Sequence, residues 1–386
     1  MPKVKYLNAN NTPMGKTLKE HRDRHLHRRR KKRDYSYIIP SQPAKLDYLT
    51  DNRDDVTITW VGHSTFLIQY AGLNILTDPI WAKRMGIGKR LTEPGIPIEK
   101  VPPVDLILIS HSHYDHMHIA SIRKLQSPKT QIIVPVGLKK KLARKQVGPC
   151  IELAWWEEIV VQGVRITFVP TQHWTRRTLF DANTSHWGGF VLEPADAVKV
   201  TPGKMVGTSK APAGEAAEPL SSNRDNLPEE NDREEDDREE SGGEEEEAKC
   251  GRWSETLNAN VSADGRPLPP TVYFAGDSGY FAGFREIGDR FPIHITLMPI
   301  GAYEPEWFMG PQHMNPEQAL QAFRDVGAEI MIPMHFGTFK LSDDTAEEAL
   351  ARLEAERERT GTSRDCIKLM AHGETMIVHA QQKMIE

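Results

Sequence analysis

The chain has 386 residues, of which 38% are hydrophobic and 8% aromatic, enough for one large domain or two ordinary ones. It contains no run of about 18 apolar residues, which excludes an ordinary transmembrane helix, and no apolar N-terminal segment typical of a secretory signal. Three widely spaced cysteines argue against a disulfide framework and indicate a reducing compartment. We therefore expect an intracellular protein, cytoplasmic or peripherally membrane-associated, with a mitochondrial location left open.

The net charge of −5 combines two segments of opposite sign. Residues 16–34 carry ten Lys or Arg against three acidic residues, and residues 229–247 carry thirteen acidic residues against two Arg. A basic arm suits the anionic headgroups of a membrane, because each basic residue near such a surface contributes about 1 kcal/mol. A solubilising or nucleic-acid-binding arm explains the same composition equally well.

In chain order, residues 1–45 are polar and basic, and we expect a largely disordered N-terminal arm with at most a short helix. From residue 46 to residue 386, apolar runs and helical spacing alternate, which predicts a mixed α/β domain. Residues 194–269 interrupt that pattern with Pro, Gly, Ser and acidic residues, which predicts an acidic disordered insertion. The predicted strands are 56–60, 66–70, 73–77, 106–109, 131–134, 164–169, 189–192, 271–275, 295–298 and 329–334. The predicted helices are 119–125, 138–145, 282–290, 316–326 and 345–360.

Four potential metal ligands directly follow the predicted strand 106–109. His111 and His113 are two residues apart in an extended segment, so their side chains point to the same side and can converge on one metal ion. Asp115 and His116 follow where the chain must turn, and can bind a second ion. Imidazole and carboxylate ligands suit zinc and similar divalent ions. A histidine-rich polar turn is the alternative, although this spacing is rare by chance.

Three further metal-competent residues each follow a predicted strand: His173, Asp277 and His335. Taken singly, each is better explained as a hydrogen-bonded structural residue. Four strand ends that repeat one pattern favour a shared site instead, because site residues in layered α/β folds collect on loops at the strand ends.

The order His-x-His-x-Asp-His, followed by separated His, Asp and His, resembles the signature of the metallo-β-lactamase superfamily. Within it, the chain is similar to the N-acylphosphatidylethanolamine-hydrolysing phospholipases D over most of residues 40–380, apart from the insertion. The segments that carry this likeness are Trp60-Val-Gly-His63-Ser-Thr65, Thr77-Asp78-Pro79-Ile80, Trp155-Trp156-Glu157-Glu158, Gln172-His173-Trp174, Gly276-Asp277-Ser278-Gly279-Tyr280, Gly301-Ala302-Tyr303-Glu304-Pro305 and His335-Phe336-Gly337-Thr338. Ser278 and Phe336 stand where the resemblance leads us to expect Thr and Trp, and neither removes a ligand.

The resemblance implies a fold, a cofactor and a reaction. The expected fold is a four-layer αββα sandwich formed by residues 46–386, with the insertion as a surface loop. Two Zn²⁺ ions are the expected cofactors, and Asp277 is expected to contact both. The remaining ligands divide into His111, His113 and His173 for one ion, and Asp115, His116 and His335 for the other.

A hydroxide shared by the two metals would then cleave the phosphodiester bond of N-acylphosphatidylethanolamine, giving N-acylethanolamine and phosphatidic acid. The expected partners are this phospholipid and a membrane surface, with a homodimer left open and no nucleic acid expected. Another hydrolase of the same fold, acting on a soluble phosphodiester, a lactone or a nucleic acid, is the alternative, because one ligand set serves many substrates. A non-catalytic module that binds through residues 16–34 is the third hypothesis, and the intact ligand set argues against it.

The resemblance also indicates residues around the metals. Gln312 and His313 are expected close to the phosphate, where His313 could donate a proton or stabilise charge, unless it is only a polar residue at a helix entry. Asp115, Asp277 and His313 are the predicted catalytic residues. Gln312, His313 and Tyr303 are the predicted substrate contacts.

Weaker candidates lie nearby. His63 and Asp78 are expected beside the metals, where hydrogen bonds fix ligand geometry, although either could be an ordinary turn residue. Glu304 is a weak substrate candidate. The apolar cluster 307–309 could contact an acyl chain, although core packing explains it better.

Overall fold

The computed structural model describes residues 5–10, 12, 16–30, 33–85, 88–197 and 268–378. The predicted insertion 194–269 lies outside the described residues except at its two ends. No helix in the described part of the chain has both the length and the apolar character needed to span a bilayer.

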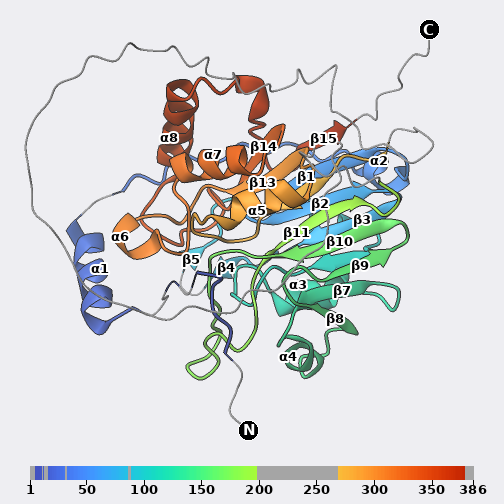
Figure 1. Cartoon of the computed structure of the whole chain (residues 1–386), viewed down its shortest axis with the longest axis horizontal. Coiled ribbons are helices and arrows are strands. Elements are labelled where there is room, and N and C mark those ends of the chain that lie inside the picture. The colour runs from blue at the N-terminus through green and yellow to red at the C-terminus, as the bar shows by residue number, and fades with distance from the viewer. Residues whose placement is uncertain are drawn as a thin grey trace, which may run out of the picture. The chain divides into compact units, whose positions relative to one another are not determined.

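One sheet has seven strands in the order β15-β1-β2-β3-β6-β7-β8 (Figure 1). Its strands are β1 (Val56–Gly62), β2 (Thr65–Tyr70), β3 (Leu73–Thr77), β6 (Leu106–Leu108), β7 (Gln131–Pro135), β8 (Cys150–Leu153) and β15 (Thr375–Val378). The pairs β15–β1, β1–β2 and β2–β3 are antiparallel, whereas β3, β6, β7 and β8 run parallel. The parallel part brings the C-terminal ends of β3 and β6 to the same edge of the sheet.

The second sheet has six strands in the order β14-β13-β12-β11-β10-β9. Its strands are β9 (Glu158–Val161), β10 (Val164–Val169), β11 (Gly189–Pro194), β12 (Val272–Phe274), β13 (Ile295–Pro299) and β14 (Ile330–Met334). The strands from β9 to β12 pair antiparallel, and β12, β13 and β14 run parallel. A separate two-stranded ribbon joins β4 (Arg84–Met85) and β5 (Gly88–Lys89).

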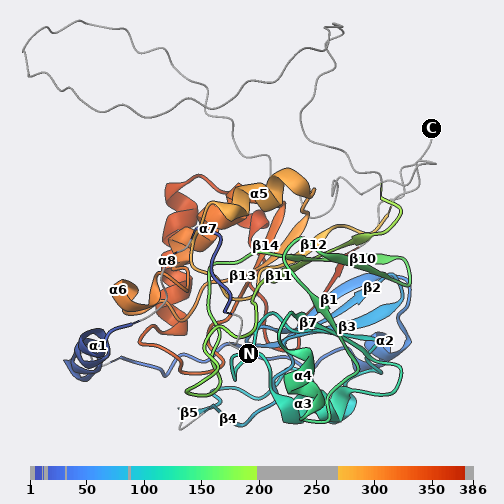
Figure 2. The same ribbon diagram turned by 60° about the horizontal axis from the view of Figure 1, so that its bottom comes forward.

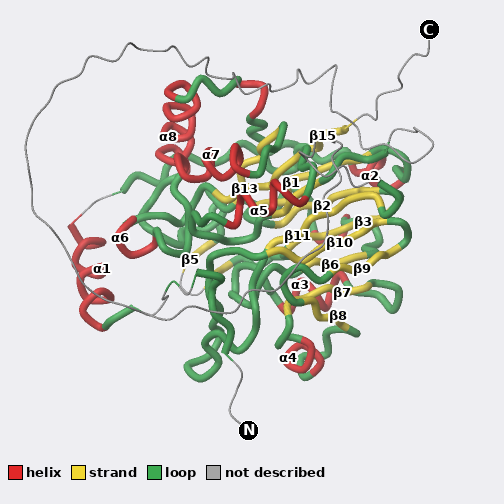
Figure 3. Tube along the Cα trace, in the orientation of Figure 1, coloured by secondary structure: helices red, strands yellow, loops and turns green. Residues whose placement is uncertain are grey.

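Helices cover the outer face of each sheet, which gives four layers (Figure 2). The seven-stranded sheet is covered by α2 (Leu46–Asp51), α3 (Ile119–Leu125) and α4 (Lys139–Ala143). The six-stranded sheet is covered by α5 (Gly283–Arg290) and α7 (Pro316–Asp325), and α8 (Ala346–Arg359) packs on α7. Two 3₁₀ turns, Ile98–Lys100 and Arg364–Cys366, complete the covering layers. Loops gather at the strand ends that face α1 (Leu18–Arg30) and α6 (Glu306–Met309) (Figure 3).

Alternation along the strands explains the layers. In β2, Phe66 and Ile68 point into the core between the sheets, whereas Leu67 points toward the helices on the outer face. Both faces are therefore apolar, and all residues of β1, β2 and β3 are buried. The polar residues within them, such as Thr57, Gln69 and Asn74, are buried as well.

The four-layer αββα sandwich expected from the resemblance is the observed fold. Helix 119–125 and strand 164–169 have the predicted bounds. The sequence pattern missed α2, α6, β8, β9 and β15. These elements are short or have an exposed edge, so their apolar periodicity is weak.

The described part of the N-terminal arm contains the 13-residue helix α1, in a region where the sequence allowed for a short helix. Cys366 is disulfide-bonded, whereas Cys150 is a buried free thiol.

Candidate metal centre

Loops at the strand ends carry the seven predicted ligands to one place. The loop between β6 and α3 contains His111, His113, Asp115 and His116, and His173 follows β10. Asp277 follows β12, and His335 follows β14 with a left-handed backbone angle φ of 63°. Parallel pairing puts the carboxyl ends of β12 and β14 at one edge of their sheet, and the short distances from Asp277 to His111 and His116 show that the loop after β6, in the other sheet, lies beside them.

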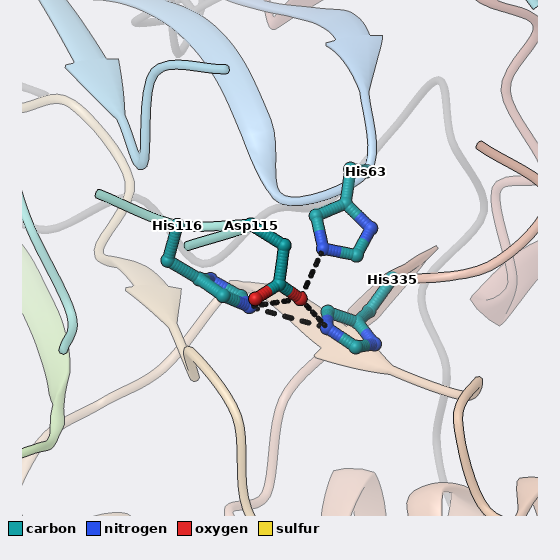
Figure 4. A group of neighbouring side chains, drawn as sticks. All are labelled: His63, Asp115, His116 and His335. Atoms are coloured by element: carbon teal, nitrogen blue, oxygen red, sulfur yellow. Dashed lines mark hydrogen bonds and ion pairs between the residues drawn. The ribbon is translucent and has the colours of Figure 1, made fainter. Parts of the chain in front are cut away.

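One group of side chains joins His116, His335 and Asp115 (Figure 4). The Nε2 atoms of His116 and His335 are 3.2 Å apart. Asp115 Oδ2 lies 3.4 Å from Nε2 of His116 and 3.6 Å from Nε2 of His335. His63 Nε2 approaches the same carboxylate oxygen to 3.1 Å, so His63 stands beside this group as expected.

A second group joins His111, His113 and His173. His113 Nδ1 lies 2.9 Å from His111 Nε2 and 3.2 Å from His173 Nε2. Asp277 lies between the two groups, because its Oδ2 atom is 3.1 Å from His116 Nε2 and 3.8 Å from Nε2 of both His111 and His173.

These distances fit divalent metal ions. Ligands at 2.0–2.1 Å from a tetrahedral zinc ion are about 3.3–3.4 Å from each other, close to the separations within each group. Asp277 Oδ1 is buried and makes no well-aligned hydrogen bond among the described residues, and it lies 3.1 Å from Nε2 of His335 in an ion pair. A buried carboxylate oxygen without such a hydrogen bond is costly unless a cation neutralises it. The donor set and its geometry therefore fit a metal centre.

The electrostatics of the cluster point the same way. Burial opposes ionisation of Asp277, but the imidazoles of His116 and His335 hold its pKa well below the usual range. Burial likewise opposes protonation of His335, yet Asp277 and Asp115 raise its pKa to about 9. Burial lowers the pKa of His113 to about 3 and of His173 to about 4. The carboxylates are thus charged and the imidazoles of His113 and His173 are neutral, which is the form that binds a metal, whereas His335 has to give up its proton when an ion binds.

Neighbouring groups fix the orientation of the imidazoles. Asp78 Oδ2 lies 2.7 Å from His116 Nδ1 and accepts a hydrogen bond from the hydroxyl of Ser110, whose oxygen is also 2.9 Å from His111 Nδ1. The carbonyl oxygen of Gln312 lies 2.9 Å from Nδ1 of His173. Each contact leaves Nε2 facing the centre, and such partners both orient a ligand and raise its basicity. Asp78 thus lies beside the proposed ligands, where the sequence led us to expect it.

The predicted substrate residues separate into two groups. His313 borders the centre, with Nδ1 3.9 Å from Asp277 Oδ2, and burial holds its pKa well below the usual range. Gln312 also lines the cavity beside the centre. Tyr303 does not, because its ring is buried in the core beneath Arg352, at 4.8 Å from the guanidinium carbon. Glu304 forms an ion pair with Arg33, at 3.4 Å.

A cavity of about 470 Å³ opens beside the metal centre. His113, Asp115, Asp277 and His313 line its inner part. Its walls include Phe308 and Met309 from the predicted apolar cluster, whereas Trp307 is 48% exposed.

The N-terminal region provides a part of this cavity that the sequence does not predict. Lys16, His21 and Arg24 line it. Asn8 is buried, and its Oδ1 accepts a hydrogen bond of 3.0 Å from the backbone N–H of the predicted ligand His173. No local signal in a polar, basic stretch predicts such contacts.

Comparison with known proteins agrees with this architecture. Residues 73–210 and 261–336, more than half of the chain, match the beta-lactamase superfamily domain. The chain belongs to this superfamily. Among solved structures, the isothiocyanate hydrolase from Delia radicum gut bacteria has a TM-score of 0.54 at 18% identity, and covers 84% of this chain and all of its own. The metallo hydrolase Igni18 from Ignicoccus hospitalis has a TM-score of 0.51 at 19% identity, over 85% of this chain and all of its own. At these identities the superpositions show the fold alone.

Two relatives with similar sequences are both named for the same enzymatic reaction. N-acyl-phosphatidylethanolamine-hydrolyzing phospholipase D 1 of Caenorhabditis elegans is 28% identical over 301 residues, which are 73% of this chain and 64% of that one. The mitochondrial N-acyl-phosphatidylethanolamine-hydrolyzing phospholipase D of Saccharomyces cerevisiae is 28% identical over 337 residues, 84% of this chain and 56% of that one. The chain thus spans less than two thirds of the length of either relative.

Proposed function

We propose that the protein is a zinc-dependent hydrolase that cleaves N-acylphosphatidylethanolamine into N-acylethanolamine and phosphatidic acid. The observation that carries the proposal is the convergence of the predicted His and Asp ligands on one buried centre. The named relatives support the choice of substrate, and the observed fold supports a hydrolytic metal site.

The ligands divide between two metal positions. His111, His113 and His173 would hold one ion, and Asp115, His116 and His335 the other. Asp277 would contact both, because its carboxylate approaches imidazoles of each group. Two divalent ions in these positions supply Lewis acidity toward a phosphoryl oxygen and an activated water.

We propose that His313 stabilises negative charge at the phosphate. Its Nδ1 atom is buried, has no hydrogen-bond partner among the described residues and belongs to a residue that lines the cavity. Because burial holds its pKa well below the usual range, the ring is neutral, so it would donate a hydrogen bond from its N–H to a phosphate oxygen without giving up a proton. Its closeness to Asp277 keeps that donor beside the reacting centre.

The surroundings of the centre can receive an acyl chain. A second cavity, of about 730 Å³, shares His113 and Asp115 with the first. Met85, Ile119 and Ala120 give it an apolar lining, which suits a hydrocarbon arm of a diester. We propose that the substrate is drawn from a membrane surface at this opening.

A soluble phosphodiester is the second candidate substrate. The observation that favours it is the set of cationic side chains, including Lys16, Arg24 and Arg176, around the first cavity. Such residues suit a small anionic ligand as well as a lipid headgroup.

The test is hydrolysis of N-acylphosphatidylethanolamine in mixed micelles by the zinc-loaded protein, with products separated by mass. Wild type should release N-acylethanolamine and phosphatidic acid, and His113→Ala should lose both activity and metal. His25→Ala is the matched control, since His25 is exposed on α1, and it should behave as wild type. A zinc-loaded wild type that releases neither product would refute the phospholipase reaction, and a parallel assay with a soluble phosphodiester would then test the second candidate.

A further inference from the structure

The N-terminal segment, meaning the described part of residues 5–33, is anchored to the domain at both ends. At its start, Asn8 binds the backbone of His173, and Asn10 donates a hydrogen bond of 2.7 Å to the side chain of Gln172. At its end, Arg33 is only 12% exposed and forms an ion pair of 3.0 Å with Glu348 on α8. The helix between these anchors is thereby held against the catalytic domain.

One face of α1 points toward the cavity. His21 and Arg24 are one helical turn apart, and both contact the ring of Phe308. The ring centroids of His21 and Phe308 are 5.3 Å apart, and the guanidinium carbon of Arg24 lies 4.7 Å from the Phe308 centroid. Lys16, just before the helix, places its ammonium 5.2 Å from the same ring. Phe308 thus makes a cation–π contact with each of the two cations, Lys16 and Arg24, and helps to hold them beside the cavity.

The two cations share the cavity with Arg176 and the metal centre. Arg176 lies on the β10–β11 loop, where its guanidinium carbon is 5.3 Å from the ring of Trp174. Among the described residues, neither Lys16 nor Arg176 forms an ion pair. Partial burial lowers the pKa of Lys16, against the weaker opposite effect of Glu20, so an anion nearby would stabilise its charged form.

We propose that Lys16, Arg24 and Arg176 form an anion-binding subsite beside the metal centre, which takes a phosphate group of the substrate or product. Ammonium and guanidinium groups provide several donors that match phosphate oxygens. The choice of phosphate rests on the proposed function, whereas the subsite itself rests on the cavity and its cations.

The subsite has a consequence for turnover. Hydrolysis of a phosphodiester yields a phosphomonoester, which carries more negative charge near neutral pH. The cationic wall therefore retains the product more strongly than the substrate. Phosphomonoesters should act as inhibitors, and the N-terminal segment should set their affinity.

Binding of glycerol 3-phosphate to the zinc-loaded full chain, measured by calorimetry at low ionic strength, tests the subsite without requiring hydrolysis. Lys16→Gln and Arg24→Gln should each raise Kd about tenfold, since each removes a charge-assisted contact at a half-buried position. Lys16→Arg should retain most of the affinity. Lys19→Gln is the matched control, because Lys19 is exposed on the same helix and does not line the cavity.

Two results would overturn the proposal. The first is an unchanged Kd in both Gln variants with normal zinc content. The second is loss of binding only to vesicles containing phosphatidic acid and not to free glycerol 3-phosphate, which would place the cations on a membrane-facing surface outside the cavity. If the protein fails to cleave N-acylphosphatidylethanolamine, the binding of glycerol 3-phosphate and of vesicles can still be measured. The anion-binding subsite and the proposed reaction can therefore be refuted independently.

Discussion

The strand-end loops and the N-terminal segment border the same metal centre, but different forces hold them there. The loops continue from fully buried strands such as β12 and β14, so the register of the sheets and the packed core place Asp277 and His335. The N-terminal segment is held by a few polar contacts, from Asn8 at one end and Arg33 at the other. A core position costs several kcal/mol to disturb, whereas a polar contact contributes about 1 kcal/mol. The strand-end loops therefore form a rigid side of the metal centre, whereas the N-terminal segment is held more weakly and is easier to displace by mutation.

The largest effect is expected from Asp277→Asn, which changes the residue between the two ligand groups. The amide keeps the shape of the side chain but loses its negative charge, so both metal positions weaken and hydrolysis falls by about 10³-fold. Metal content by mass spectrometry and the thermal unfolding midpoint should separate lost metal from lost fold. Asp365→Asn, at an exposed position, should change neither, and near-normal turnover in Asp277→Asn would contradict the two-metal assignment.

A smaller effect is expected from Asp78→Asn. Asp78 belongs to the strand-end loops, but it contacts the ligand His116 and is not itself a proposed ligand. Its carboxylate accepts hydrogen bonds from the backbone N–H of Ser110 and lies 2.7 Å from His116 Nδ1. Loss of this charge should lower zinc affinity about 10- to 100-fold, measured by competition with a chelator. Unchanged affinity would show that Asp78 only shapes the turn.

A third variant, Asn8→Ala, tests whether the N-terminal segment positions the metal ligands. It deletes the acceptor for the backbone N–H of His173, so we expect about a tenfold loss of metal affinity and an altered visible spectrum of the cobalt-substituted protein. Asn8→Asp keeps the accepting oxygen and should restore most of the spectrum. Lys5→Ala, at an exposed position near the start of the same segment, is the control. A wild-type spectrum for Asn8→Ala would mean that the segment covers the site without positioning it.

The smallest effect on the metal centre is expected from Arg33→Ala, at the C-terminal end of the N-terminal segment. Its removal leaves Glu304 and Glu348 without their partner and should lower the free energy of unfolding by about 1–2 kcal/mol. Zinc affinity should stay within twofold, in contrast to Asn8→Ala. Urea denaturation of Arg33→Ala beside Arg22→Ala, whose guanidinium is largely exposed, checks this. A fall in zinc affinity as large as that of Asn8→Ala would show that the two anchors act together.

Much of the fold could be predicted because its strands are buried on both faces. Such strands are mostly apolar, as in 73–77 and 164–169, even though each contains a polar residue such as Asn74 or Arg165, and the ends of these segments indicate where the chain turns. Short elements with an exposed edge, such as β9 with its exposed Val160, carry too little apolar periodicity to be recognised.

Local residue spacing is enough to predict the first part of the metal site. The spacing of His111 and His113 after a strand makes their side chains converge, because successive residues of an extended chain alternate in direction. Family resemblance extended this to His173, Asp277 and His335, and the structure brings all of them together.

The residues that surround the metal site come together through long-range packing of the chain. Asn8 contacts a residue 165 positions away, and Arg33 pairs with one 315 positions away. Tyr303, expected at the substrate, is buried in the core instead. A hydrogen bond or ion pair depends on where two backbones meet in space, and composition alone made the basic N-terminal stretch look like a free arm. Residue spacing therefore specified the ligands, whereas chain packing specified the walls of the cavity.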